Sequence, residues 1–99
     1  MDASIHSISW QRRAPNQSPV LIENGREELY SGSTAELVSR TRAVTLIARD
    51  GAEVQVAVRR TLGPESWEGE ILRIAPTSSG LKVGATVSFE ESHVQGGTI

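Results

Sequence analysis

The feature that most constrains this chain is the pair Asp50-Gly51, which stands between two runs of apolar residues. In the second run Val54, Val56 and Val58 alternate with other residues at period two, which is typical of a strand buried on one face. An Asp-Gly pair between two such runs is a strong signal of a β-hairpin. We therefore expect the fold to be built around this hairpin.

The length of the hairpin loop decides which side chains face the core. A three-residue loop over 49–51, with Gly51 in the left-handed conformation, gathers the large apolar residues on one face. A two-residue loop mixes apolar and polar residues on each face, because a shift in register moves side chains off the core face. We therefore predict the three-residue loop, which pairs Val44 with Val56, Leu46 with Val54 and Ala48 with Ala52.

Other segments also carry turn, strand and helix signals. Asn24-Gly25 predicts a second hairpin. Ser33 and Glu36 have the spacing of a capping box, which predicts one short helix of about two turns. Apolar residues fall on both faces of an expected strand over 67–74, so we expect a bulge or bend near Gly69. Two more strands are expected at 5–10 and 85–89.

These short strands, separated by Gly and Pro turns, predict a mainly β fold. We expect either a small SH3-like barrel or a rolled antiparallel sheet, with one short helix. The 99 residues fit a single domain over 1–99. Within it, residues 1–19 are expected to be partly irregular and residues 95–99, which include a Gly-Gly pair, to be a flexible tail.

Scarce residue types exclude several chemistries. The chain has no Cys, so it forms no disulfide, thiolate zinc site or cysteine nucleophile. Its two histidines, His6 and His93, stand at no spacing typical of a metal site, and no Gly-x-Ser-x-Gly motif occurs. We therefore predict no catalytic residue, no cofactor and no metal, and a domain that acts by binding; an enzyme is the less favoured alternative.

The composition also bears on source and location. Nine Arg against one Lys are typical of a GC-rich bacterial genome. No apolar run reaches the ~20 residues of a membrane span, and the N-terminus lacks a basic region followed by an apolar stretch. With the absence of Cys, these features predict a cytoplasmic bacterial domain that does not bind membranes.

Opposite charges gather in different parts of the sequence, although the net charge is only −2. Residues 40–60 carry a net charge of +3, and residues 63–99 a net charge of −3. Guanidinium groups bind phosphate and carboxylate bidentately, so clustered Arg residues are candidates for binding an anion or a partner. The alternative is a solvating or ion-pairing role for Arg and a place in the core for Trp. The candidate residues are Arg42, Arg59, Arg60, Trp67, Arg12 and Arg13.

A set of turn and apolar residues in the last third of the chain matches a known pattern: Trp67, Gly69, Ile71, Ile74, Pro76, Leu81, Val83, Gly84, Val87, Phe89, His93 and Val94. Through these residues, 67–94 resembles the C-terminal part of small bacterial YegJ-like domains, which implies an SH3-like barrel and brings no function with it. Ala85 stands where that family usually has Asp.

A second resemblance begins with Arg12-Arg13 and continues with the spacing of Gly69, Ile71 and Ile74. Through them the chain resembles a reduced PilZ domain, the cyclic-di-GMP receptor barrel, which implies that Arg12 and Arg13 bind a cyclic dinucleotide. Residues 73–75 stand where that family has the Asp and Ser of its second motif.

Taken together, the sequence predicts a small bacterial binding module whose partner is another protein. Binding of nucleic acid or a cyclic dinucleotide through the Arg clusters is the alternative, since phosphate is a strong ligand for Arg. The oligomeric state stays open.

Overall fold

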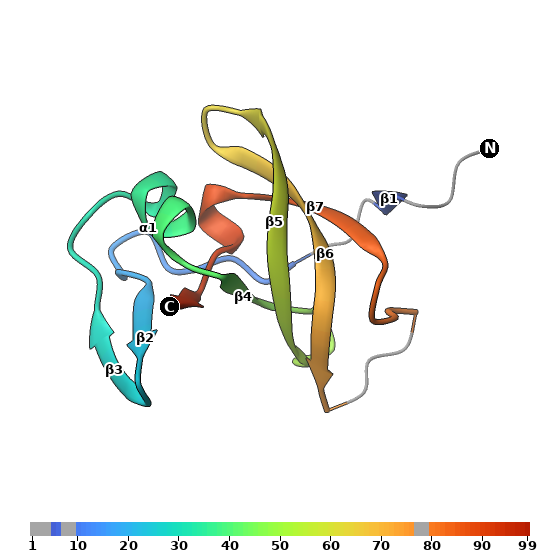
Figure 1. Cartoon of the computed structure of the whole chain (residues 1–99), viewed down its shortest axis with the longest axis horizontal. Coiled ribbons are helices and arrows are strands. Elements are labelled where there is room, and N and C mark those ends of the chain that lie inside the picture. Colours follow the sequence, from blue (N-terminus) through green and yellow to red (C-terminus); the bar gives the residue numbers. More distant parts are fainter. Residues whose placement is uncertain (1–4, 7–9, 77–79) are drawn as a thin grey trace.

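A computed structural model describes residues 5–6, 10–76 and 80–99 of the chain. Eight strands form one mixed sheet in the order β1-β7-β6-β5-β4-β8-β2-β3 (Figure 1). The strands are β1 (Ile5–His6), β2 (Val20–Glu23), β3 (Arg26–Leu29), β4 (Ala43–Ile47), β5 (Glu53–Gly63), β6 (Ser66–Ala75), β7 (Thr86–Glu90) and β8 (Gly96–Thr98). The helices are α1 (Thr34–Arg40) and the 3-10 helix η1 (Glu91–His93).

The prediction of a mainly β fold with one short α-helix is confirmed. The sheet is not closed into a barrel, because β1 and β3 form its two edges and do not pair with each other. It is also mixed, since β1 runs parallel to β7 and β2 runs parallel to β8. Among the described residues, no helix is both long and apolar enough to cross a membrane.

The hairpin β4–β5 has the predicted register. Val44 pairs with Val56 and Leu46 pairs with Val54. The N–H of Ala48 donates to the carbonyl of Ala52 at 2.8 Å, and Gly51 has a φ of 92°, as a three-residue loop requires. The local apolar pattern was therefore sufficient to fix this register.

The other local signals also hold. Asn24 and Gly25 both have positive φ and join β2 to β3, with Glu23 opposite Arg26. Ser33 caps α1, and its side chain accepts from the N–H of Glu36 at 3.1 Å. The strand expected at 5–10 consists of β1 and an isolated bridge at position 10; residues 7–9 lie outside the described residues.

The β5–β6 pairing is irregular at Gly69, as expected, although the extra residue there is Arg59 of β5, and a further bulge in β6 lies at Leu72. Arg73 pairs with Gln55 and Ile71 pairs with Val56, which leaves Leu72 as the extra residue. The bulge keeps Ile71 and Ile74 against the core while Leu72 and Arg73 both become exposed. Two neighbouring side chains therefore reach the outer face of the sheet, which a regular strand does not allow.

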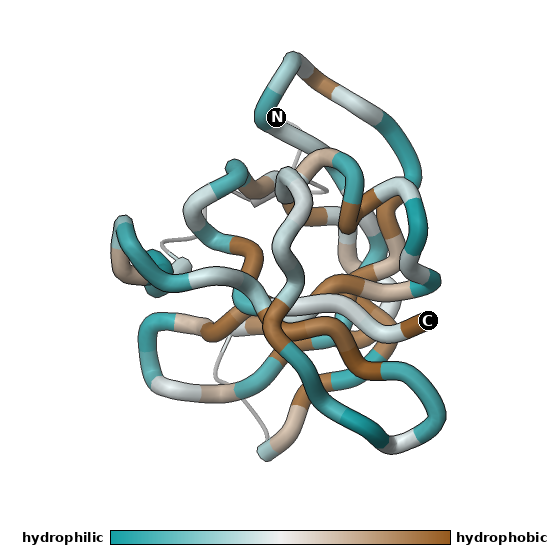
Figure 2. Tube along the Cα trace, turned by 90° about the vertical axis from the view of Figure 1, so that its left-hand side faces the viewer, coloured by the Kyte–Doolittle hydropathy of each residue, from teal (hydrophilic) through white to brown (hydrophobic). Residues whose placement is uncertain are grey.

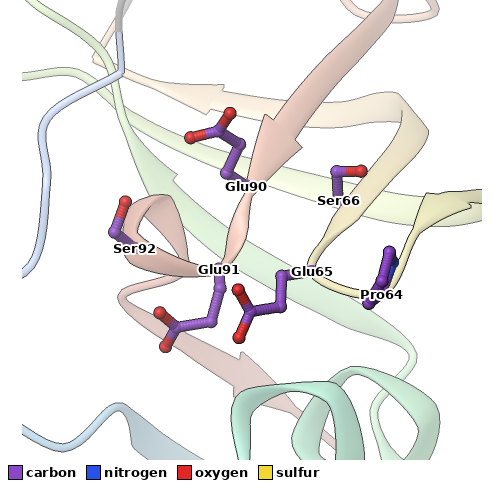
Figure 3. Close-up of a pocket in the computed structure, with 6 residues that line it drawn as sticks. All are labelled: Pro64, Glu65, Ser66, Glu90, Glu91 and Ser92. Atoms are coloured by element: carbon purple, nitrogen blue, oxygen red, sulfur yellow. The ribbon is translucent and has the colours of Figure 1, made fainter.

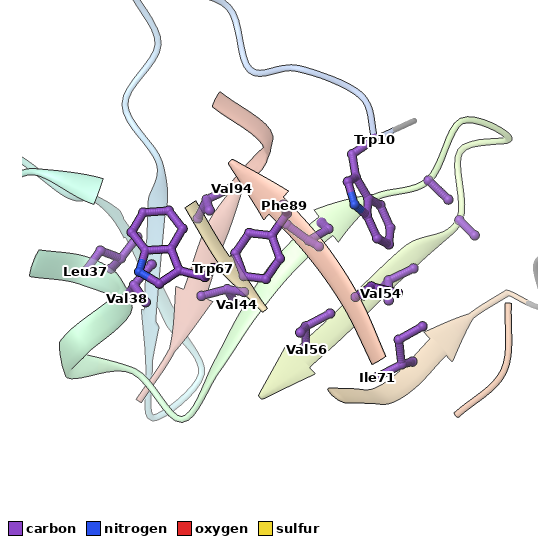
Figure 4. Packing of buried hydrophobic residues seen from close by; sticks show 14 of the residues in the cluster. Trp10, Leu37, Val38, Val44, Val54, Val56, Trp67, Ile71, Phe89 and Val94 are labelled. Carbon is purple, nitrogen blue, oxygen red and sulfur yellow. The ribbon is translucent and has the colours of Figure 1, made fainter. Parts of the chain in front are cut away.

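The core is built mainly from residues of the strands and of α1 and contains all four aromatic residues of the chain. Figure 4 shows Trp10, Trp67 and Phe89 within it. Trp67 and Phe89 stack with ring centroids 5.8 Å apart, and the indole N–H of Trp10 donates to the carbonyl of Ser88 at 2.9 Å. Figure 2 shows hydrophobic stretches in the interior and hydrophilic ones in the turns. Tyr30 is buried as well, so no aromatic ring lies on the surface.

The prediction of a flexible tail over 95–99 is wrong. Gly96–Thr98 form β8, which lies between β4 and β2 in the sheet. A Cβ at Gly96 would lie 2.4 Å from the carbonyl oxygen of Val20, so this glycine allows a close approach of the two backbones. Among the described strands, β8 is the one that joins the hairpin β2–β3 to the rest of the sheet.

We predict that Gly96→Ala lowers the free energy of unfolding by about 1–3 kcal/mol, because the new methyl group collides with backbone that cannot move alone. Urea unfolding measures this loss. Gly63→Ala is the matched control, since its Cβ would meet only the Ser66 hydroxyl, at 2.9 Å, and that side chain can rotate. We expect the control to change stability by less than about 0.5 kcal/mol. Equal stability of both variants would contradict the role given to β8.

Candidate functional site

Two of the predicted arginines, Arg59 and Arg60, neutralise acidic residues on the neighbouring strand. Arg59 forms an ion pair with Glu70 at 3.0 Å, and Arg60 forms one with Glu68 at 3.5 Å. These contacts arise because the basic end of β5 pairs with the acidic beginning of β6. The two oppositely charged stretches of sequence therefore partly cancel across one hairpin.

Trp67, the predicted aromatic contact, belongs to the core. Its side chain is 4% exposed and stacks on Phe89 (Figure 4). A large aromatic residue in a small domain contributes more by burial than by surface contact, which is the alternative that the sequence left open. Trp67 is therefore not available to a ligand.

Arg12 and Arg13 have different environments although they are neighbours. Arg12 is exposed, with its guanidinium 3.6 Å from the carboxylate of Glu90 and within hydrogen-bond distance of Ser92. The side chain of Arg13 is only 10% exposed and pairs with Glu91 at 2.5 Å. Arg12 and Arg13 thus both contact groups of the chain itself.

The guanidinium of Arg13 connects four segments of the chain. Its Nε donates to the carbonyl of Gln17 at 2.8 Å, and one terminal nitrogen donates to the carbonyl of Val94 at 2.5 Å. The other terminal nitrogen donates to Thr34, at the start of α1, and to the Glu91 carboxylate in η1. Hydrogen bonds from Thr34 and then Arg13 hold the pKa of Glu91 below its ordinary value. This arrangement, here called the Arg13 clamp, has a structural role.

An acidic hollow lies beside the clamp, between the β5–β6 turn and η1 (Figure 3). Of its three carboxylates, Glu90 faces Arg12 and Glu91 is bound by Arg13, which leaves Glu65 without an ion pair among the described residues. Nowhere among the residues that the structure describes is a group of three or more His, Asp or Glu side chains arranged to hold a metal ion. The lining residues are Pro64, Glu65, Ser66, Glu90, Glu91 and Ser92.

A second hollow, of about 450 Å³, lies where β8, β4, β5 and β6 run side by side. We call it the basic hollow, because its charged residues are Arg42 and Arg73. The bulge at Leu72 brings Arg73 to this surface, and the N–H of Arg42 donates to the carbonyl of Thr98 at 2.9 Å. The lining residues are Arg42, Ala43, Gln55, Leu72, Arg73 and Thr98.

The two arginines of the basic hollow differ from those described above in their electrostatics. Arg42 and Arg73 are exposed, and neither forms an ion pair with a carboxylate of the described residues. Gln55 adds an amide between them, and its nitrogen donates to the hydroxyl of Thr45 at 2.9 Å. The hollow therefore offers two uncompensated positive charges next to the apolar side chain of Leu72.

Of the six predicted residues, the structure keeps Arg42 as a free cation and adds Arg73. Arg73 was missed because a regular strand would not place it beside Leu72 on the outer face. The mixed apolar pattern of residues 67–74 was the available signal, since it indicated a bulge. Thr98 was missed because the Gly-Gly pair before it was interpreted as a tail.

We predict that Arg13→Ala lowers the free energy of unfolding by about 2 kcal/mol or more, since it leaves buried hydrogen-bond acceptors and the Glu91 carboxylate without their donor. Arg12→Ala removes an exposed pair and should cost less than about 0.5 kcal/mol. Thermal and urea unfolding of the two variants provide the comparison. Similar losses in both variants would show that Arg13 is not a clamp.

Comparison of the chain with protein-family models, with curated proteins and with solved structures finds no match. The resemblances to YegJ-like and PilZ domains therefore stay predictions.

Proposed function

We propose that this domain is a protein-binding module and that its basic hollow binds an acidic segment of the partner protein. The observation that carries the proposal is the pair of unpaired guanidiniums of Arg42 and Arg73 on one hollow. Four other arginines of the chain form ion pairs with its own glutamates. Among the five arginines without an ion pair in the described part of the chain, Arg42 and Arg73 are the two that line one hollow, which makes them the natural contacts for a carboxylate from another molecule.

The lining of the hollow suggests what accompanies the carboxylate. Leu72 is 44% exposed, although large apolar side chains are usually buried. Val83, which is 64% exposed, lies nearby, because the N–H of Gly84 donates to the carbonyl of Ile71 at 2.7 Å. A segment that carries both acidic and apolar side chains complements this surface better than a purely charged one.

Nucleic acid fits this surface less well than a protein. Sequence-tolerant binding of single strands relies on aromatic side chains on which bases stack, and the four aromatic residues here are buried. A cyclic dinucleotide at Arg12 and Arg13 would have to displace their contacts with Glu90 and Glu91.

The test is a titration with a short synthetic peptide in which two Glu flank a Leu, followed by calorimetry or fluorescence anisotropy. We expect binding that weakens with added salt, because surface charges are screened. Arg42→Gln/Arg73→Gln should reduce the affinity about tenfold or more, since both charge-assisted contacts are lost. The same peptide with Gln in place of Glu should not bind measurably.

The matched control is Arg59→Gln/Arg60→Gln, which removes the same number of charges from ion-paired positions. We expect it to bind the acidic peptide within about twofold of the native chain. Equal losses in the two double variants would mean that net charge alone attracts the peptide. Tighter binding of a short oligonucleotide or of cyclic-di-GMP than of the peptide would favour the phosphate alternative.

A further inference from the structure

His93 lies at an unusual position in the short helix η1. Its Nδ1 atom accepts a hydrogen bond from the backbone N–H of Glu90, three residues before it, at 3.0 Å. Helix starts commonly use the side chain of Glu or Gln at this position to accept that N–H. Here a buried imidazole takes their place, and an imidazole can be protonated near neutral pH.

The hydrogen bond determines which form of the ring is compatible with the fold. A nitrogen that accepts carries no proton, so the neutral ring of His93 has its hydrogen on Nε2. Protonation then takes place at Nδ1 and turns it into a donor. Two donors would face each other, and the Glu90 N–H would lose its partner.

The charges around the ring come from two other segments. The guanidinium of Arg12 disfavours a positive charge on His93, and the carboxylate of Glu90 favours it. Within η1, the charge of Glu91 is already balanced by Arg13. Burial, with a smaller effect of Arg12, holds the pKa of His93 below its ordinary value.

Several contacts that join distant segments depend on η1. The N–H of Glu91 donates to the carbonyl of Glu65 at 2.9 Å, and the carbonyl of Ser92 accepts from the backbone N–H of Arg13 at 2.7 Å. The Arg13 clamp also binds Glu91 and Val94. The chain continues from there into β8.

We propose that η1 is an acid-sensitive latch. While the Nδ1 atom of His93 accepts from the N–H of Glu90, η1 is closed and holds the segment of Arg13 against the entry to β8. When that nitrogen is protonated, η1 opens. An open η1 gives His93 an ordinary pKa, near 6.5. Since the closed form holds the proton less tightly, the latch is closed above that pH and weakens as the pH falls below it. The ratio of open to closed forms rises at most about tenfold per pH unit.

The test is amide hydrogen exchange by NMR between about pH 7.5 and about pH 5, within the range in which histidine titrates. A His6→Gln background leaves His93 as the one titrating imidazole. We expect the protection factors of the Glu90 and Arg13 amides to fall by about tenfold or more relative to that of Leu46 in β4. Unchanged relative protection while His93 becomes protonated would overturn the proposal.

His93→Asn is the matched variant, because its side-chain oxygen can accept from the same N–H and does not titrate. In this variant the protection of Glu90 should be independent of pH over the same range. Should His93→Asn fail to fold, the ring ¹⁵N shifts of the native chain still decide the question. A neutral ring that carries its proton on Nδ1 would refute the latch.

Discussion

The fold depends on the insertion of β8 between β4 and β2. Gly96 permits the contact with Val20, and the resulting strand carries the hairpin β2–β3. The Arg13 clamp fixes the chain just before β8 by binding the carbonyl of Val94. At the other end of β8, Thr98 accepts from the backbone of Arg42 and so positions one wall of the basic hollow. The continuity of the sheet and the position of the basic hollow therefore both depend on β8.

Charge pairing explains why one surface stands out in a chain whose net charge is small. The acidic residues of β6 and of the β7–η1 region neutralise four arginines, either across a hairpin or through the clamp. The bulge at Leu72 then brings Arg73 to the same surface as Arg42. Of the arginines that stay without an ion pair among the described residues, these two line one hollow next to an exposed leucine, and the proposed protein-binding function follows from that pairing.

Local patterns predicted the parts of the fold that depend on neighbouring residues. The register around Gly51, the turn at Asn24-Gly25 and the Ser33 cap each follow from the properties of a few adjacent residues. The place of β8 depends on backbone contacts with strands about fifty or more positions away in sequence, and a Gly-Gly pair alone does not distinguish a strand from a tail. The candidate site was only partly predictable because it also depends on contacts between strands. The pairing of β5 with β6 decides which arginines form ion pairs and which do not.

An NMR titration of the ¹⁵N-labelled chain with the Glu-Leu-Glu peptide locates the binding surface. We expect the largest chemical-shift changes at the residues that line the basic hollow: Arg42, Gln55, Leu72, Arg73 and Thr98. Amides near the Arg13 clamp and the acidic hollow should change little. Shifts centred on Arg12, Arg13 or Glu65, or no shifts at a saturating peptide concentration, would contradict the assignment of the basic hollow as the binding site.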